Sequence, residues 1–281
     1  MNVSISEYYN NFKAFYHSPS QLIRNITECW FNDNMYCPFC LTSSIEAFGN
    51  NHAVSDYYCN ICREEFQLKS KKNKFGKIIT DGEYNKMIEA IYSHKTPNFF
   101  FLNYSANIEY INNLILVPKE FIVPSVIQKR KPLSIRAIRS GWTGCNIAIG
   151  SIPDRGKIFT IKDSKPIEKS YVKSNIISID FLRRIKDVDS RGWLNDLLFL
   201  VSEIKQEIFT LNDVYKFVPI LKKLHPTNNN VKAKIRQQLQ VLRDNGIIEF
   251  IGRGLYKKKM KAMRKILHVN IRVLRLFLVL Q

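Results

Sequence analysis

The sequence predicts an α/β (α+β) protein with two domains, of which the first carries a zinc-binding loop and the second is helical and ends in a β-hairpin. Three observations predict this arrangement. Two Cys-x-x-Cys pairs lie near the N-terminus, strand-like and helix-like segments alternate over residues 79–118, and from Ser190 the pattern is helical before two short strands. A chain of 281 residues is long enough for two domains. We expect domains over 1–188 and 189–257, and a basic, apolar extension over 258–281.

The chain is strongly basic, because 43 Lys and Arg residues outnumber 24 Asp and Glu residues and give a formal net charge of +19. An excess of this size favours a polyanionic partner, with nucleic acid ahead of a membrane surface. The hydrophobic content of 45% is typical of globular domains and excludes a disordered chain.

The two cysteine pairs have the spacing of a zinc site. They are Cys37 and Cys40 in "CPFC" and Cys59 and Cys62 in "CNIC", with eighteen residues between the pairs. This frame brings four thiolates to one tetrahedral ion and leaves no position for water, so the zinc is expected to be structural. The alternative is four unrelated free cysteines. Six cysteines are too few for a disulfide scaffold, and no secretory signal is recognisable, so we expect a cytoplasmic protein.

The segment after the second pair alternates as a strand does. Residues 65–69 read Glu-Phe-Gln-Leu-Lys, which places Glu65, Gln67 and Lys69 on one face and turns the apolar residues to the other. Asp56 stands three residues before the second cysteine pair. An acid on one strand and an amide-x-lysine pair on the next form a minimal metal site for phosphodiester hydrolysis.

In such a site the oxygens of Asp56, Gln67 and the main chain of Leu68 would hold magnesium, which prefers hard oxygen ligands. Lys69 would position the attacking water and offset charge at the phosphorus. The alternative is a solvated strand face beside the zinc site, since charged alternation is common on antiparallel strands.

The rest of the first domain contains one predicted helix, two predicted strands and a basic loop. The segment "DGEYNKMIEAIYSHK" over 81–95 has an amphipathic helical pattern, and "NFFFLNYS" and "NNLILVP" are typical of buried strands. In the loop "QKRKPLSIRAIRSGWTGCNI", Arg136 and Arg139 suit phosphate contacts. A solvated charged loop is the alternative.

The second domain has the pattern of a winged helix-turn-helix. Helices are predicted in "RGWLNDLLFLVSEIK", "FTLNDVYKFVPILKKL" and "NNNVKAKIRQQLQVLRDNG", and two strands in "IIEFIGRGLYK". Thr210 and Asp213 form a predicted capping box for the second helix. The third helix has a predicted buried stripe, and Gly246 ends it. The stripe consists of Val231, Ile235, Leu239 and Leu242.

The opposite face of the third helix suits DNA reading. Arg236, Gln237 and Gln240 suit base edges in a major groove. Lys232, Lys234 and Arg253 suit phosphates. A solvent-facing helix surface is the alternative. The extension 258–281 is too short and too interrupted by arginine to span a bilayer, so we expect no membrane partner, although a cationic helix lying on a membrane stays open.

Several of these segments occur together, in the same order, in one known family. "CPFC", "VSDYYCNICREEFQLKSKK", "NFFFLNY", "QKRKPL", "SGWTGCNI", "SRGW" and "KIRQQLQVLRDNGIIEFIGRG" resemble the DpnI family of methyl-directed restriction endonucleases, over residues from about 20 to 257. The resemblance implies a restriction-endonuclease-like core of the P-D…(D/E)-x-K kind with an inserted zinc loop, followed by a winged helix. It also implies magnesium-dependent cleavage of double-stranded GATC sites that carry N6-methyladenine.

Carried over to this chain, the family motif falls on Asp56, Gln67 and Lys69. The chain departs from the family where Gln67 replaces a glutamate, which removes a charge from the magnesium ligands, and Glu65 on the same strand face is a candidate contributor. The resemblance also implies that Trp142 senses the methyl group. An ordinary core tryptophan is the alternative.

The sequence therefore predicts a monomeric type II methyl-directed endonuclease that acts on methylated double-stranded DNA, with catalytic magnesium and structural zinc. The alternative function is a catalytically weakened methyl-DNA-binding protein, a reader or repressor, in which Gln67 replaces the usual carboxylate.

Overall fold

The computed structural model describes residues 1–43, 45–49, 55–72 and 75–259. The chain divides into two compact units, Met1–Phe199 and a second that begins at Leu200. Helix α5 (Val188–Glu203) runs across this division, so the predicted boundary at residue 188 stays a prediction. The predicted extension lies outside the described residues from residue 260 onward. Within the described ranges, no helix has the length and apolar character needed to cross a bilayer.

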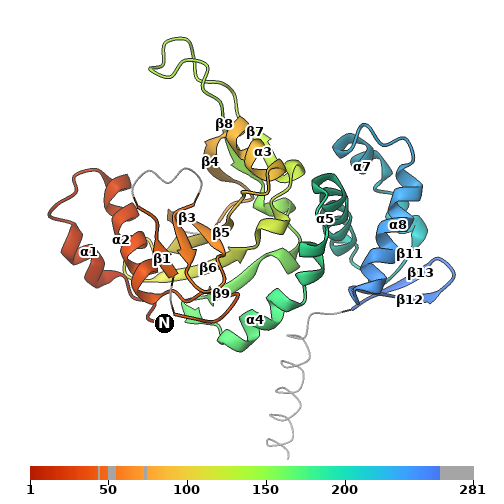
Figure 1. Ribbon diagram of the computed structural model, residues 1–281, viewed down its shortest axis with the longest axis horizontal. Helices are drawn as coiled ribbons and strands as arrows, with labels where there is room; N and C mark the ends of the chain where they lie inside the picture. The colour runs from red at the N-terminus through yellow and green to blue at the C-terminus, as the bar shows by residue number, and fades with distance from the viewer. Residues whose placement is uncertain (44, 50–54, 73–74, 260–281) are drawn as a thin grey trace, which may run out of the picture. The chain divides into compact units, whose positions relative to one another are not determined.

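A seven-stranded sheet forms the centre of the first unit (Figure 1). In spatial order its strands are β1 (Ile45–Ala47), β2 (Tyr57–Cys59), β3 (Glu65–Lys72), β5 (Asn98–Tyr104), β6 (Ile111–Val117), β9 (Ile158–Lys162) and β10 (Lys165–Pro166). Neighbours pair antiparallel except β3 and β5, which are parallel. A parallel pair requires a crossover connection, and here the crossover contains β4 (Ile79–Glu83) and α3 (Tyr84–Tyr92).

The core lies around β5, in which all seven residues are buried. Phe100 packs against Phe66 of β3 and against Phe31 of α2 (Pro19–Asn34), with ring centroids 5.4 Å and 5.0 Å apart. The two buried strands predicted from "NFFFLNYS" and "NNLILVP" are confirmed as β5 and β6. Two further helices, α1 (Ser6–Phe12) and α4 (Lys169–Ile177), lie against α2 and β9 respectively.

A smaller antiparallel sheet has the order β4-β8-β7, with β8 (Gly144–Ile147) and β7 (Ile127–Lys129). The helix predicted over 81–95 is shorter than expected, because residues 79–83 pair with β8 before α3 begins. Between β7 and β8 the chain extends as a projecting arm, residues 130–143 (Figure 1). Short 3-10 helices occur at η1 (Lys119–Phe121), η2 (Pro124–Val126), η3 (Ile149–Ser151), η4 (Asp154–Gly156) and η5 (Asp180–Arg184).

Up to residue 259, the second unit combines three complete helices with a small sheet of order β11-β13-β12. Its elements are β11 (Ile208–Thr210), α6 (Leu211–Tyr215), α7 (Val218–Leu224), α8 (Val231–Asp244), β12 (Ile248–Gly252) and β13 (Leu255–Lys258). The capping box of Thr210 and Asp213 is confirmed. The prediction of one helix through "FTLNDVYKFVPILKKL" is wrong: Pro219 in the first turn of α7 cannot follow a continuous helix, since its ring would clash with the carbonyl of Tyr215, where α6 ends.

Helix α8 buries the predicted apolar stripe against the rest of the second unit. The buried residues are Val231, Ile235, Leu239 and Leu242, together with Gln238, which the sequence did not single out. Gly246 has φ +67°, a left-handed conformation that glycine adopts without strain, and it ends the helix as predicted.

Candidate active site and zinc centre

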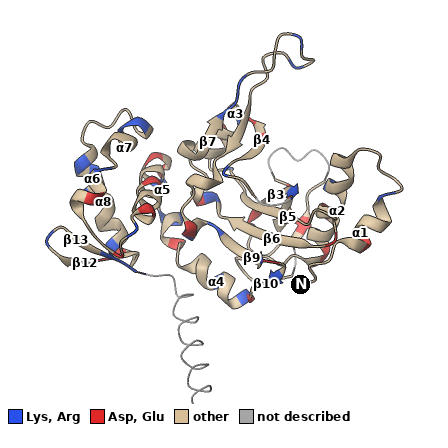
Figure 2. Ribbon diagram, turned by 180° about the vertical axis from the view of Figure 1, so that it is seen from behind, with Lys and Arg blue, Asp and Glu red and all other residues tan. Residues whose placement is uncertain are grey.

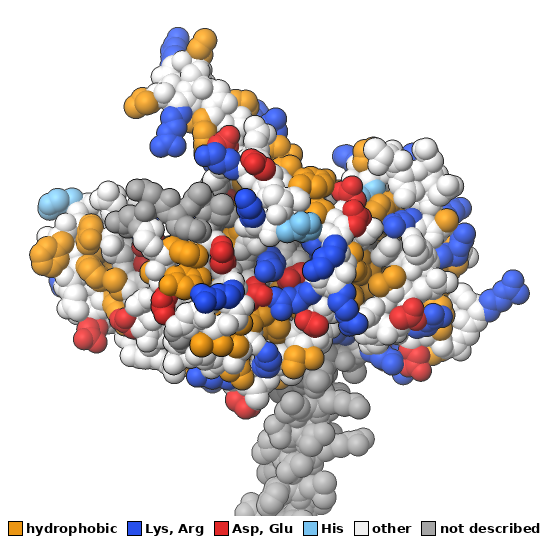
Figure 3. All heavy atoms as spheres, viewed as in Figure 1, with side chains coloured by type: hydrophobic (Ala, Val, Ile, Leu, Met, Phe, Trp, Pro, Cys, Tyr) orange, Lys and Arg blue, Asp and Glu red, His pale blue; other side chains and the backbone are white. Residues whose placement is uncertain are grey.

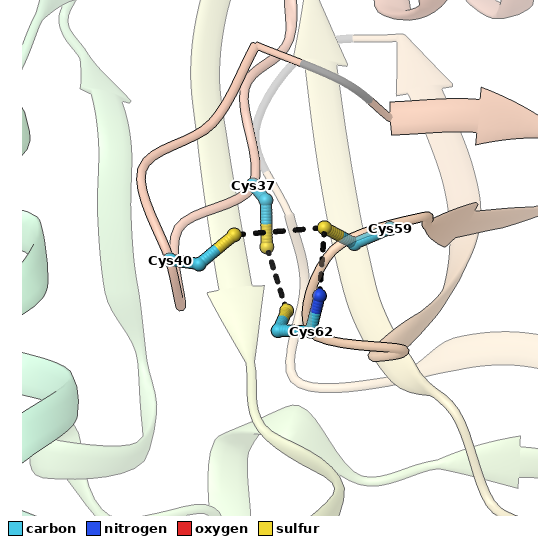
Figure 4. Close-up of side chains that lie close together, drawn as sticks. All are labelled: Cys37, Cys40, Cys59 and Cys62. Atoms are coloured by element: carbon cyan, nitrogen blue, oxygen red, sulfur yellow. Dashed lines mark hydrogen bonds between the residues drawn. The ribbon is translucent and has the colours of Figure 1, made fainter.

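The four predicted zinc ligands meet at one point, with their thiols directed toward one another (Figure 4). The Sγ atoms of Cys37 and Cys62 are 3.5 Å apart, and so are those of Cys40 and Cys59. A tetrahedral zinc ion with Zn–S bonds of about 2.3 Å separates its sulfur ligands by about 3.8 Å. The four residues therefore fit a zinc ion. Within the described ranges, no other group of three or more His, Cys, Asp or Glu residues brings its ligand atoms so close together.

Both cysteine pairs sit in the same kind of backbone turn. The N–H of Leu41 donates to the carbonyl of Cys37 at 2.8 Å, and the N–H of Arg63 donates to the carbonyl of Cys59 at 3.0 Å. Leu41 and Arg63 both have left-handed φ, 66° and 62°. Burial alone would raise the pKa of the Cys59 thiol, but backbone N–H groups, first that of Cys62, outweigh it and lower the pKa. The thiolate, which is the form that binds zinc, is thus favoured at Cys59, whereas burial raises the pKa of the Cys37 and Cys62 thiols. At those two positions the ion itself would have to displace the proton.

A cavity of about 320 Å³ beside the start of β3 brings together four residues of the predicted catalytic site: Asp56, Gln67, Leu68 and Lys69 all line it. The carboxylate Oδ2 of Asp56 accepts the N–H of Leu68 at 2.8 Å, and the N–H of Asp56 donates to the carbonyl of Phe66 at 2.9 Å. These two bonds fix Asp56 against β3. The oxygen donors at positions 56, 67 and 68 fit a magnesium ion, which prefers such ligands.

The ammonium group of Lys69 is paired with Asp81, a residue of β4 that sequence reasoning missed. The Asp81 side chain is only 3% exposed, and that of Lys69 is 24% exposed. The second carboxylate oxygen of Asp81, Oδ2, is buried and has no hydrogen-bond partner among the described residues. An acid from the smaller sheet therefore holds the lysine that the sequence assigned to the chemistry.

Helix α2 contributes a second acid that was missed, Glu28, which lines the same cavity. Its Oε1 accepts Nε of Arg24 at 2.7 Å. Glu65, by contrast, does not line the cavity of Asp56, and its Oε2 accepts the hydroxyl of Ser55 at 2.5 Å. The structure therefore brings Glu28 to the predicted site and does not bring Glu65 there.

The arm between β7 and β8 carries the predicted phosphate-contacting residues, Arg136 and Arg139, both of which are exposed. Lys and Arg residues, blue in the ribbon of Figure 2, occur along this arm and on the second unit. Trp142 is half-buried at the base of the arm. A Cβ atom on Gly144 would lie 2.9 Å from the ring of Trp142, so the absence of a side chain at Gly144 leaves room for that ring.

The exposed face of α8 presents four of the five side chains that the sequence assigned to DNA on this helix, and the fifth, Lys234, is half-buried. The four exposed side chains are Lys232, Arg236, Gln237 and Gln240. Arg236 donates from Nη1 to the hydroxyl of Tyr215 at 2.8 Å, and the ammonium of Lys232 lies 5.2 Å from the centre of the same ring. Tyr215 thereby orders two cations on this face. Arg253 is exposed in the turn between β12 and β13.

Two family models match the chain. The DpnI model, described as the Dam-replacing family, matches residues 5–185, and the DpnI_C model, described as the Dam-replacing HTH domain, matches residues 189–258. Together with the large sheet and the four-cysteine cluster, these matches confirm the predicted fold class, a mixed α/β domain with a four-cysteine loop that fits zinc, followed by a helix-turn-helix domain.

Proposed function

This chain belongs to the Dam-replacing family, that of DpnI, and on this premise we propose that it cleaves double-stranded DNA at GATC sites that contain N6-methyladenine, by metal-assisted phosphodiester hydrolysis. Family membership supports a methyl-dependent restriction endonuclease, and the helix-turn-helix match supports DNA binding. The observation that carries the proposal is the cavity of Asp56, Gln67, Leu68 and Lys69.

In this proposal the carboxylate of Asp56, the amide oxygen of Gln67 and the carbonyl of Leu68 hold magnesium. When bound, the ion supplies charge neutralisation at the phosphate and a more acidic water. Asp56 is already oriented for this role before the ion binds, because its hydrogen bonds with Leu68 and Phe66 fix it to β3. Lys69 orients the attacking water and offsets the charge that develops on the phosphate oxygens. Asp81 keeps the lysine side chain directed and its charge compensated until DNA is bound.

Gln67 gives this site one negative charge fewer than the family motif supplies. Magnesium should therefore bind more weakly here than at a site with a carboxylate at position 67. Glu28 offsets part of this loss in the proposal, because its carboxylate lines the same cavity. The pairing of Glu28 with Arg24 limits that compensation. We therefore expect activity that needs a higher magnesium concentration than a carboxylate at position 67 would need.

Recognition is assigned to both units. Trp142 offers the methyl group an apolar surface, Arg136 and Arg139 contact phosphates, and the exposed face of α8 reads base edges. A monomeric state and a cytoplasmic location stay predictions.

A methyl-DNA reader or repressor without catalysis is the second candidate, and the one observation that favours it is Gln67. Digestion of GATC-methylated and unmethylated plasmid, with magnesium and with a chelator, separates the two functions. We expect cutting of methylated plasmid in magnesium only. Methyl-selective binding without cutting at any magnesium concentration would establish the reader instead.

Single substitutions connect the result to the site. Asp56→Ala and Lys69→Ala should abolish cleavage while methylated DNA is still bound. Lys71→Ala is the matched control, since this exposed lysine lies two residues further along β3 and does not line the cavity. Cleavage by Lys69→Ala at the parent rate would show that the site is misassigned. Loss of cleavage in Glu65→Gln would show that Glu65 belongs to the catalytic site.

A further inference from the structure

A second and larger cavity lies in the first unit and shares no lining residue with the cavity of Asp56. Its volume is about 680 Å³, and four cationic side chains, Lys119, Arg183, Lys186 and Arg191, belong to its lining. They come from η1, from the end of η5 and its following turn, and from the first turn of α5. Figure 3 shows Lys and Arg side chains gathered together with Asp, Glu and His side chains on one face of the molecule.

Two nearly buried side chains in this lining have polar atoms that make no hydrogen bond to any residue the structure describes. Arg191 is 9% exposed, and its Nε is buried and makes no hydrogen bond, although Nη1 donates to the carbonyl of Ile185 at 3.1 Å. Thr96 is 7% exposed, and its hydroxyl also has no partner. Arg191 forms no ion pair among the described residues, although the carboxylates of Glu120 and Asp187 lie close enough to attract its charge. Buried donors without acceptors are rare in folded proteins, and here two of them border one cavity.

Two of the other cations, Lys119 and Arg183, are held in place by a buried acid, Glu64. Its Oε2 accepts the ammonium of Lys119 at 3.0 Å and the amide of Asn98 at 2.9 Å, and its Oε1 pairs with Arg183. Arg183 also donates from Nε to Glu120 at 3.1 Å. Fixed cations of this kind need no reordering when a ligand arrives, which favours binding.

The charges around the cavity balance in number, but two of the cations form no ion pair among the described residues. The cations are the four named above, and the acids in or directly beside the lining are Glu64, Glu120, Asp180 and Asp187. Glu64 and Glu120 are already paired with Lys119 and Arg183, whereas Lys186 is exposed and Arg191 is attracted by Glu120 and Asp187 without forming an ion pair. A guanidinium fork and a hydroxyl are donors that fit the oxygens of a phosphate group.

We propose that this cavity is an anion-binding site that takes the phosphate group of a nucleotide-sized ligand, with Arg191, Thr96 and Lys186 as its donors. The volume is far larger than a bare phosphate ion needs and lies within the range of small-molecule sites, about 300–1,000 Å³. The phosphate can belong to a free nucleotide or to a DNA strand, since both offer the same oxygens. The site is separate from the proposed nuclease cavity, and its occupation does not depend on magnesium bound there.

The first measurement is the affinity of the full-length, zinc-loaded protein for a nucleoside 5′-monophosphate, dAMP, by calorimetry without magnesium. Thermal melting in phosphate against chloride at equal ionic strength accompanies it. We expect dAMP to bind and phosphate to raise the melting temperature above its value in chloride. A protein that binds no dAMP and melts equally in both salts holds only water in this cavity, and that result overturns the proposal.

Variants place the binding in the cavity. Arg191→Gln and Lys186→Gln should each weaken dAMP binding about tenfold, the value of one charge-assisted hydrogen bond. Thr96→Val keeps the side-chain volume, should weaken binding and should raise the melting temperature of the free protein, because a buried hydroxyl without a partner is removed. Lys165→Gln is the control for charge alone, since Lys165 is exposed on β10 outside the cavity. Parent affinity in both Lys186→Gln and Thr96→Val would refute the site.

Two further measurements identify the source of the phosphate and separate this site from the nuclease. If a short unmethylated duplex displaces dAMP, and Lys186→Gln weakens duplex binding too, the phosphate belongs to DNA; if the duplex leaves dAMP bound, the ligand is a free nucleotide. Lys69→Ala should bind dAMP as the parent does. Loss of dAMP binding in Lys69→Ala would show that the nucleotide occupies the nuclease cavity instead and would overturn the proposal.

Discussion

Glu64→Gln removes the negative charge that holds Lys119 and Arg183 beside the second cavity, while keeping the shape of the side chain. Removing one partner of a buried ion pair costs about 3–5 kcal/mol of stability. The side chains of Lys119 and Arg183 are 37% and 33% exposed, and Arg183 keeps its hydrogen bond to Glu120. The expected loss of unfolding free energy is therefore at the low end of this range, about 3 kcal/mol. For a unit of this size, Met1–Phe199, that loss lowers the melting temperature by about 6–12 °C.

The loss should depend on pH in a defined direction. Burial alone would raise the pKa of Glu64, but the charge of Lys119, the hydrogen bond from Asn98 and the charge of Arg183 outweigh it and lower the pKa. An acid whose pKa is lowered by folding stabilises the protein above its unfolded pKa, about 4.3, and this contribution is lost as the pH falls through the folded value. The difference in unfolding free energy between parent and variant should therefore be constant above about pH 6 and shrink below about pH 5.

Urea unfolding of the parent and the variant over a pH series, with saturating zinc so that both proteins stay loaded, measures this difference. Glu89→Gln is the matched control, because it removes an exposed acid from α3 and should leave stability within about 0.5 kcal/mol of the parent. A variant as stable as the parent at neutral pH would refute the stabilising role of the ion network. A difference that stays constant or grows on acidification would refute the assigned pKa direction.

Three further predictions concern the zinc site, the magnesium site and the methyl contact. Cys59→Ser should lose bound zinc and much of its folded structure, because the loop between the cysteine pairs carries Asp56; full zinc content by metal analysis would contradict this. Gln67→Glu should raise cleavage most at limiting magnesium, where an added charge counts most, and an unchanged magnesium dependence would mean that position 67 holds no ion. Trp142→Ala should reduce the ratio of methylated to unmethylated cleavage by about fourfold for each methyl group that it contacts. Gly144→Ala should also reduce it, because the new Cβ displaces the Trp142 ring; an unchanged ratio in both variants would remove the tryptophan from methyl sensing.

Features encoded by short-range spacing could be predicted from the sequence. The spacing of the cysteines reflects two local turns, and the alternation over 65–69 reflects the geometry of one strand. The apolar stripe of α8 follows from helical periodicity alone. The break between α6 and α7 after Tyr215 also has a signal in the sequence, because Pro219 is incompatible with a helix that continues through this point.

Features assembled from distant segments could not be predicted. Asp81 lies on β4, which is part of the connection from β3 to β5 and pairs with β8 in the smaller sheet, and this arrangement brings it to Lys69. In the sequence, the polar stretch around Asp81 resembles the first turn of a helix, so nothing local indicates a strand there. Glu28 reaches the same cavity from α2, with no motif around it. The second cavity gathers residues as far apart as Thr96 and Arg191, and each of them alone resembles an ordinary surface residue.

The parallel pairing of β3 with β5 has a consequence for the order of events during protein synthesis. All four cysteines have been translated by residue 62, whereas β5, the strand that β3 must join, ends only at Tyr104. Zinc would therefore close the loop from Cys37 to Cys62 on the nascent chain, which shortens the free segment and lowers the entropy lost when β1 and β2, both inside this loop, pair. A ribosome in a zinc-depleted cell would release a chain whose first hairpin is unformed when β5 is synthesised. Zinc supply would then govern the yield of folded protein rather than the speed of each molecule.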